Sequence, residues 1–380
     1  MRAYEWVLNL EEPLSEFIHS LQVGNQSGHY RLMHAGLSPI GEKIALSASC
    51  FAHKTAYTIG LWQQLSLLEQ NQWNEFIRSF QSEGNPLQLA FGQHAFIDFP
   101  IYEDTARRLK PQLNWRGKLK QAYRQRFQGV SNPYEAMANA ILISETKQAL
   151  AGLMQVGAQA KYPYQAFPQT ELAIKKFLKS LNWAQPWEAG GRAASLAVLL
   201  VTQIHAHTEA LQQLRSFYAQ IADPASGAYF IAPQRPETGI LINGAMKVLT
   251  ALDWLDERIH YPEALIDTTL SAWPQSEGCH LVDAVYVLYR ASRESQHRRK
   301  EIQTYIQEVM KMIQAHWVAD QKAFSYYTQG AQTHYYGVEI SQGLSDQADL
   351  HGTVLLTWAL AMCFDILEDE NLPQWSVLRP

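Results

Sequence analysis

The alternation of two kinds of helical segment is the feature that most constrains how this chain folds. From about residue 185 onward, a sparsely charged apolar segment is followed each time by one rich in Lys, Glu and Gln. Examples are GGRAASLAVLLVTQ before HTEALQQLRSFYAQI, and LVDAVYVLYRA before HRRKEIQTYIQEVMKMIQAHW. Apolar residues recur at helical spacing, and the alternation typical of strands is scarce. Because a helix that is apolar all round must be buried and one with a polar face can cover it, we expect two layers of helices.

Helix start and stop signals predict about twelve helices, enough for six antiparallel pairs. Asn132-Pro133 and Thr170-Glu171 are favourable helix starts. Six pairs with the apolar member of each inside form an all-α ring, an α/α toroid. No break resembles a long flexible linker, so we expect one domain over residues 1–380, less regular in its N-terminal half (about 1–130). The expected ranges are roughly 42–65, 70–82, 101–126, 133–157, 168–181, 188–205, 206–221, 239–257, 261–272, 279–293, 296–318 and 348–368.

Composition excludes several classes of protein. Lys and Arg number 31 against 36 Asp and Glu, giving a formal charge of -5, so no broad positive surface is expected for nucleic acid. The three cysteines form no CxxC pair, which argues against a disulfide framework or a zinc ribbon. Glu5, Glu11 and Glu12 interrupt the apolar run that a signal peptide needs, and no uncharged apolar stretch reaches the roughly 20 residues of a membrane span. We expect a soluble cytoplasmic protein.

Most of the expected inner helices begin with small or polar residues. This layout resembles the α/α toroids of the terpenoid cyclase and protein prenyltransferase group, in which inner-helix ends line a central funnel. The segments LVDAVYVLYRA and ADLHGTVLLTWAL resemble the prenyltransferase β-subunit pieces that carry the zinc ligands. In that resemblance Asp283 matches the Asp ligand and His351 the His ligand, but Val285 stands where the Cys ligand is found.

The resemblance covers roughly the last half of the chain and concerns the fold more than the chemistry. The DxDD motif of cation-initiating cyclases and the DDxxD motif of ionising synthases are both missing. Because Val285 replaces the thiolate, too few protein ligands remain for a closed zinc site, and zinc is not expected. No GxGxxG or Walker-type loop occurs either, so no nucleotide cofactor is expected.

Ionisable residues at the starts of inner helices are the candidate catalytic groups. We predict His351 as the proton carrier, Asp349 or Asp283 as its partner, and Glu188 on the opposite side of the cavity. Structural alternatives exist for each group. Asp349 is also suited to cap its helix, His351 to form a hydrogen bond in the first turn, and Glu188 to pair with Arg192 one turn later.

A second set of residues is predicted to contact substrate. Tyr335 and Tyr336 lie in the irregular stretch 323–343, which is rich in Tyr and Gly and is predicted to form a lid or rim over the cavity; a hairpin that merely closes the ring is the alternative. Cys279, next to His280, is a competent metal ligand, but a small buried Cys needs no metal to explain it. The full set of predicted substrate contacts is Trp187, Arg192, Asn243, His280, Tyr335 and Tyr336.

These patterns favour an enzyme whose aromatic-lined central cavity performs acid/base chemistry on a prenyl- or terpenoid-type substrate. A glycan-processing α/α toroid, acting as a lyase, epimerase or hydrolase, is one alternative. A toroid that only binds a ligand or another protein is the other. A terpenoid site should be deep and mostly apolar, whereas the site of a glycan lyase, epimerase or hydrolase should be an open cleft with two carboxylates a few ångströms apart and exposed aromatic platforms. The expected partner is a small molecule or glycan in the cavity; the sequence specifies no oligomeric state.

Overall fold

The computed structural model describes residues 4–110, 132–204 and 208–380. Within these ranges it contains thirteen α-helices and four two-residue strands. Parts of three predicted helices, residues 111–126, 205 and 206–207, lie outside the described ranges. The helices are α1 (Glu11–Ser20), α2 (Leu46–Thr58), α3 (Leu67–Ser79), α4 (Phe99–Leu109), α6 (Pro133–Gln155), α7 (Glu171–Ser180), α8 (Pro186–Ile204), α9 (Thr208–Ile221), α10 (Thr238–Trp254), α11 (Pro262–Leu270), α12 (Gly278–Ser292), α13 (Arg299–Gln314) and α14 (Leu350–Leu367). The strands are β1 (Trp317–Val318), β2 (Ala323–Phe324), β3 (His334–Tyr335) and β4 (Val338–Glu339), and short 3-10 turns span Glu5–Val7, Gly41–Lys43, Trp62–Gln64 and Ala319–Gln321.

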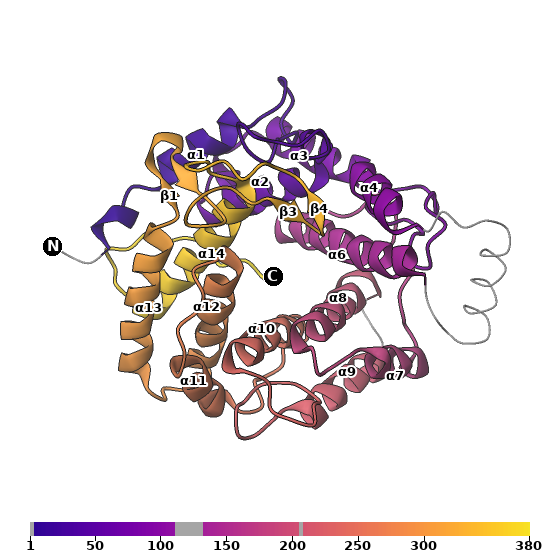
Figure 1. Cartoon of the computed structure of the whole chain (residues 1–380), viewed down its shortest axis with the longest axis vertical. Coiled ribbons are helices and arrows are strands. Elements are labelled where there is room, and N and C mark those ends of the chain that lie inside the picture. Colours follow the sequence, from indigo (N-terminus) through magenta and orange to yellow (C-terminus); the bar gives the residue numbers. More distant parts are fainter. Residues whose placement is uncertain (1–3, 111–131, 205–207) are drawn as a thin grey trace.

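Six helices form a closed inner ring. Going round it, α2 contacts α6, α6 contacts α8, and the contacts continue through α10, α12 and α14 back to α2 (Figure 1). The other helices pack outside this ring: α3 on α2, α4 on α6, α9 on α8, α11 on α10 and α12, and α13 on α12 and α14. The fold is therefore an all-α α/α toroid, and the predicted fold class is confirmed.

The burial of α13 and α14 shows why the sequence pattern predicts the two layers. Helix α13 buries a single stripe, with Ile302, Ile306, Val309 and Ile313 spaced three or four residues apart. Helix α14 is buried along nearly its whole length, in keeping with its mean apolar character. By length and composition α14 also resembles a membrane span, but 78% of that segment is buried inside the ring, where its apolar surface meets other helices.

Glycines allow α8 and α10 to pack closely. A Cβ atom added at Gly190 would lie 3.0 Å from the Cβ atom of Lys247 and 3.3 Å from the carbonyl oxygen of Gly244. A Cβ atom added at Gly244 would lie 2.6 Å from the Cβ atom of Pro186. These glycines therefore serve the contact between two inner helices, and this contact fixes the spacing of the cavity walls described below.

Most helix boundaries follow the local signals, and the exceptions have physical causes. Asn132 accepts a hydrogen bond from the Tyr134 backbone N–H, so this predicted cap is confirmed. Helix α2 ends before the predicted boundary because Gly60 adopts a left-handed conformation, with φ of +80°. Helix α1 was not predicted. Its Pro13 lies in the first turn, where a proline is tolerated, and its one buried stripe is only ten residues long.

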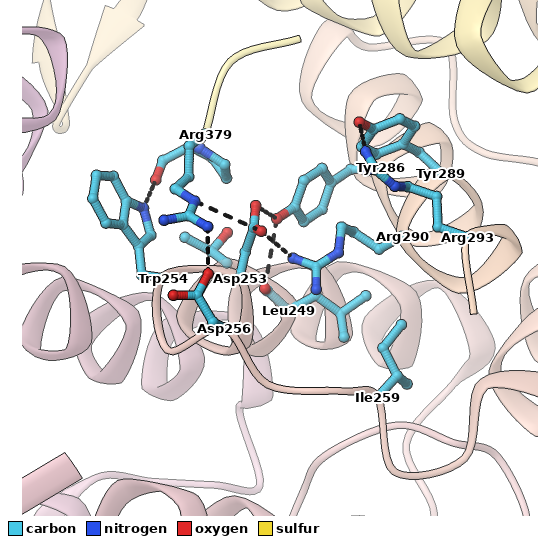
Figure 2. Close-up of polar contacts among 12 residues, drawn as sticks. Leu249, Asp253, Trp254, Asp256, Ile259, Tyr286, Tyr289, Arg290, Arg293 and Arg379 are labelled. Carbon is cyan, nitrogen blue, oxygen red and sulfur yellow. Dashed lines mark hydrogen bonds and ion pairs between the residues drawn. The ribbon is translucent and has the colours of Figure 1, made fainter. Parts of the chain in front are cut away.

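The C-terminal segment crosses one end of the ring and is anchored to α10 and, through the Trp358 indole, to α14. The Trp254 indole N–H donates a hydrogen bond of 2.7 Å to the carbonyl oxygen of Pro380. Asp253 pairs with Arg290 at 2.7 Å and lies 3.8 Å from the guanidinium of Arg379 (Figure 2). Asp253 thus helps to hold the C-terminal segment against the ring.

Candidate functional site

A cavity of about 340 Å³ lies inside the ring where α6, α8 and α10 meet. This volume falls in the range of small-molecule sites, ~300–1,000 Å³. Tyr336, from the β3–β4 hairpin, and Pro380, from the C-terminal segment, complete its wall. The polar and ionisable side chains of α6, α8 and α10 in the wall are Ser144, Lys147, Gln148, Glu188, Arg192, Ser195, Lys247 and Thr250.

Three lysines from three inner helices converge on the interior of the ring. Lys54 comes from α2, Lys147 from α6 and Lys247 from α10, and the charges of Lys54 and Lys247 both act on Lys147. None of the three forms a hydrogen bond or ion pair with any residue in the described ranges. Amines held together without a counter-ion repel one another, so this arrangement favours a bound anion or the loss of a proton.

Lys147 is the lysine whose protonation is most strongly affected. Burial, followed by the positive charges of Lys54 and Lys247, lowers the pKa of Lys147 from its ordinary value of 10.5 to about 7. Burial also lowers the pKa of Lys54. Near neutral pH, about half of the Lys147 side chains therefore carry an uncharged amine with a free lone pair. Such an amine can accept a proton or attack an electrophile, as catalytic lysines do.

Three predicted residues of the first turns of α8 line the cavity. Trp187 is 51% exposed and lies beneath the Lys247 ammonium, which is 5.4 Å from the ring centre. The Arg192 guanidinium lies 5.6 Å from the ring centre of Phe177, and its Nε atom is buried without a hydrogen-bond partner in the described ranges. Glu188 and Arg192 do not pair within 4 Å, so the ordinary salt bridge considered for this pair from the sequence is absent.

The β3–β4 hairpin brings Tyr336 into the cavity. At the tip of the hairpin, Tyr336 has a φ of +50°, a left-handed conformation that is uncommon outside glycine and marks a specific turn. Its hydroxyl is hydrogen-bonded to Ser144 on α6 and to Tyr335. Tyr335, whose hydroxyl also accepts a hydrogen bond of 3.2 Å from the Ser47 hydroxyl, does not line the cavity. Both sequence interpretations of this stretch therefore apply, since a hairpin closes the ring and one of its tyrosines lines the cavity.

Asp349 and His351 lie in a packed part of the ring. Asp349 caps α14: one carboxylate oxygen accepts from the Gly352 N–H at 2.7 Å, and the other accepts from the N–H groups of Tyr326 (2.9 Å) and Gln332 (3.1 Å). His351 bonds to the Gln332 amide oxygen at 2.8 Å and stacks on Phe51, with ring centres 4.6 Å apart. Neither residue lines the cavity.

Burial shifts the pKa values of Asp349 and His351 toward their neutral forms. It raises the pKa of Asp349 to about 6, against the effect of its backbone hydrogen bonds. It lowers the pKa of His351 to about 3, and the charges of Lys247 and Lys54 act in the same direction. A histidine with so low a pKa is uncharged at neutral pH and is a weak base. Their predicted catalytic roles stay predictions, while these contacts account for both residues structurally.

The remaining predicted residues lie round the ring on α10 and α12, also outside the cavity wall. Asp283 is 2% exposed. Burial raises its pKa to about 6, against the opposing effect of the Lys247 charge. His280 is hydrogen-bonded to Asn243 at 2.9 Å and is 3.8 Å from Glu277. Trp187, Glu188, Arg192 and Tyr336 are thus the members of the predicted set that the fold brings together at one cavity.

Two buried acidic residues that act on each other, Asp98 and Glu145, were not predicted from the sequence. Glu145 is 1% exposed and accepts a hydrogen bond of 2.7 Å from the Tyr102 hydroxyl. Burial and the nearby Asp98 carboxylate raise the pKa of Glu145 well above its ordinary range. Asp98 accepts backbone N–H bonds at the start of α2, and burial raises its pKa to about 6. Burial therefore favours the uncharged form of Glu145, which is next in the chain to Ser144, a hydrogen-bond partner of Tyr336.

The three lysines are the main residues that sequence reasoning missed, although a signal existed. Lys54 and Lys247 are each the single charged residue of a segment of mostly small or apolar residues, CFAHKTAY for Lys54 and NGAMKVLT for Lys247. Lys147 follows the apolar run ANAILIS with only Glu145 as a charged neighbour. A lone lysine in an otherwise buried helix has no solvated face to occupy, so it must point at a cavity or a partner. Among the described residues, no three His, Cys, Asp or Glu side chains group as metal ligands.

Comparison with known proteins adds little. No protein-family model and no curated protein matches the chain. Among solved structures, it is similar to an inactive variant of an α-1,6-mannanase of Salegentibacter sp. HEL1_6 in complex with α-1,6-mannotetrose, at 12% identity and a TM-score of 0.43, covering 95% of this chain and 99% of that chain. A similarity this distant carries no argument about activity, which has to come from the residues of the cavity.

Proposed function

We propose that the central cavity binds a small acidic molecule of the uronate sugar type and removes the proton from the carbon next to its carboxylate. This proton abstraction is the shared first step of sugar-acid lyases and epimerases, so the proposal narrows the glycan-processing alternative. One observation supports it above all: Lys147 and Lys247, neither of which forms an ion pair with a described residue, line a cavity whose wall also contains Arg192, and the charge of nearby Lys54 acts on Lys147. A carboxylate placed among them offsets their repulsion.

The residues of the cavity supply the roles that this reaction needs. Lys247 and Arg192 are placed to hold the substrate carboxylate and to stabilise the negative charge that develops on it as the proton leaves. Lys147, half uncharged near pH 7, is the base. The Tyr336 hydroxyl is the candidate acid that returns a proton. The half-exposed face of Trp187 offers a platform for a sugar ring.

The same wall argues against the competing functions. A prenyl- or terpenoid-type substrate is bound mainly by apolar contacts, whereas basic side chains from three helices, Lys147, Arg192 and Lys247, line this cavity. A glycosidase needs two carboxyl groups on either side of the scissile bond, and among the described residues that line the cavity Glu188 is the sole carboxylate. A non-catalytic binder of acidic ligands differs from the proposed enzyme only in turnover, which the experiment below measures.

The experiment compares uronic-acid oligosaccharides with neutral oligosaccharides of similar size. We expect the acidic set alone to raise the melting temperature of the protein. We further expect turnover, seen as an unsaturated product or as deuterium uptake from heavy water at the carbon next to the carboxylate. Lys147→Gln should abolish turnover, while Lys300→Gln, on outer helix α13, should leave it unchanged. Equal stabilisation by neutral sugars would overturn the proposal, and so would full turnover by Lys147→Gln.

A further inference from the structure

The lone pair of Lys147 that can take a proton can also attack a carbonyl carbon. We propose that Lys147 reversibly captures aldehydes and ketones that carry a carboxylate, forming an imine inside the central cavity. The geometry that supports this is the position of Lys147 on the cavity wall, close enough to Lys54 and Lys247 for their charges to act on it, and without a hydrogen bond or ion pair to any described residue. The capture rests on the acidic-ligand recognition proposed above and adds a covalent step to it.

The surroundings of Lys147 meet the requirements of an imine-forming amine. Desolvation and the neighbouring cationic groups keep the amine partly uncharged, which is the usual way in which a lysine becomes a nucleophile. Binding of the ligand carboxylate by Lys247 and Arg192 would hold the adjacent carbonyl carbon in the cavity that Lys147 also lines. An aldehyde without a carboxylate lacks this anchor and should react less well.

The step is chemically complete without a cofactor. The amine nitrogen forms a bond to the carbonyl carbon, and the oxygen becomes the hydroxyl of a carbinolamine. That hydroxyl then leaves as water as the C=N bond forms, and both hydrogens of the neutral amine end in this water. Ser144 lies one helical turn before Lys147 on α6 and is hydrogen-bonded to the Tyr336 hydroxyl, so this pair can pass the proton from nitrogen to the departing oxygen.

The test uses glyoxylate as the anionic aldehyde and acetaldehyde as its neutral counterpart, with cyanoborohydride to trap the imine on the intact chain at pH 7. Peptide mass mapping identifies the modified lysines. We expect glyoxylate to label Lys147 roughly a hundredfold faster than Lys300, because a pKa near 7 greatly increases the uncharged fraction of the amine. Acetaldehyde should label Lys147 about tenfold more slowly than glyoxylate. Mapping the wild-type chain makes this result independent of whether any variant folds.

Two variants separate reactivity from mere exposure. Lys247→Gln removes a positive neighbour, so the pH at which labelling of Lys147 is half-maximal should move upward, and more glyoxylate should be needed. Lys300→Gln should change neither. A pH midpoint that does not move in Lys247→Gln would overturn the proposal, as would labelling of Lys147 no faster than that of Lys300.

A third ligand distinguishes failure of the capture from failure of the function. Lactate has a carboxylate like that of glyoxylate but no aldehyde or ketone group. It should therefore bind Lys247 and Arg192 and protect Lys147 from labelling. Protection by lactate without any glyoxylate adduct at Lys147 would overturn the capture alone. Equal labelling by glyoxylate and acetaldehyde, without protection by lactate, would overturn the capture and the acidic-ligand proposal together.

Discussion

Two sides of the ring treat their ionisable groups in opposite ways. On the packed side, where α14 meets the segment before it, the Asp349 carboxylate accepts three backbone N–H bonds and His351 is stacked and hydrogen-bonded. On the cavity side, formed by α6, α8 and α10, Lys147 and Lys247 have no such partner among the described residues. Polar groups whose bonds are complete within the chain have little left for a ligand. The comparison teaches that incomplete pairing at a cavity, rather than the mere presence of charge, marks the candidate site.

The largest expected effect tests the packed side. Asp349→Asn leaves one acceptor oxygen where two now bind three N–H groups, and it turns an amide NH₂ toward backbone donors. We expect the free energy of unfolding at pH 7 to fall by about 2–4 kcal/mol, measured by urea denaturation. The exposed Asp346, replaced by Asn, should change it by less than about 0.5 kcal/mol. Equal free energies of unfolding for the two variants would show that the hydrogen bonds of Asp349 do not stabilise the fold.

His53 sharpens the comparison, because its ring nitrogens are unpaired although it does not line the cavity. Both of its ring nitrogens are buried without a partner in the described ranges, and the ring packs against Trp62 and Trp73. Burial lowers its pKa to about 3, below the ordinary 6.5, so its contribution to stability is present above pH 6.5 and is lost as the pH falls toward 3. His53→Leu should lack this loss.

We expect the stability advantage of His53→Leu over wild type to grow by about 2 kcal/mol between pH 7 and pH 5, measured by urea denaturation at each pH. Binding of acidic ligands should not change, since an enclosed histidine has no cavity to serve. A variant whose pH dependence parallels wild type would show that the unpaired ring is not what makes the protein sensitive to acid.

Lys147 should combine a cost in stability with a gain in function. Its pKa of about 7 lies below the ordinary value, so its contribution to stability is present above the ordinary pKa of 10.5 and is lost as the pH falls toward 7. Lys147→Met should therefore be more stable than wild type by about 1–2 kcal/mol at pH 7, and the difference should shrink by pH 10. Thermal melts with and without a uronic-acid ligand measure both effects. A variant that is destabilised, or that keeps the stabilisation by ligand, would contradict this role.

The fold was accessible from the sequence because each inner helix carries its burial in its own residues. The apolar run of α14 and the single stripe of α13 can be recognised without knowing their neighbours. The ring follows, since helices of these two kinds satisfy one another only in two layers. The short helix α1 was not predicted, because its apolar stripe is short and Pro13 lies near its start.

The site was only partly accessible, because it depends on which side chains meet. Trp187, Glu188 and Arg192 lie close together in the first turns of α8 and could be found as a local cluster. Lys54 and Lys147 are 93 residues apart in the numbering, and nothing in either segment states that they face each other. Tyr336 rather than Tyr335 lines the cavity because Tyr336 itself adopts a left-handed conformation, which the sequence does not predict.

The smallest expected effect concerns two pairs of oppositely charged residues, one within a helix and one between two helices. Glu188 and Arg192 are one helical turn apart on the cavity side and form no ion pair, whereas Asp253 and Arg290 are paired at 2.7 Å at the anchored end of the ring. Double-mutant cycles should give a coupling energy below about 0.3 kcal/mol for the first pair and about 1 kcal/mol for the second, whose side chains are 24% and 11% exposed. A coupling at Glu188 and Arg192 as large as that at Asp253 and Arg290 would mean that the two helix residues neutralise each other. Arg192 would then be unavailable to a substrate carboxylate, and the positive charge of the cavity would rest on the lysines alone.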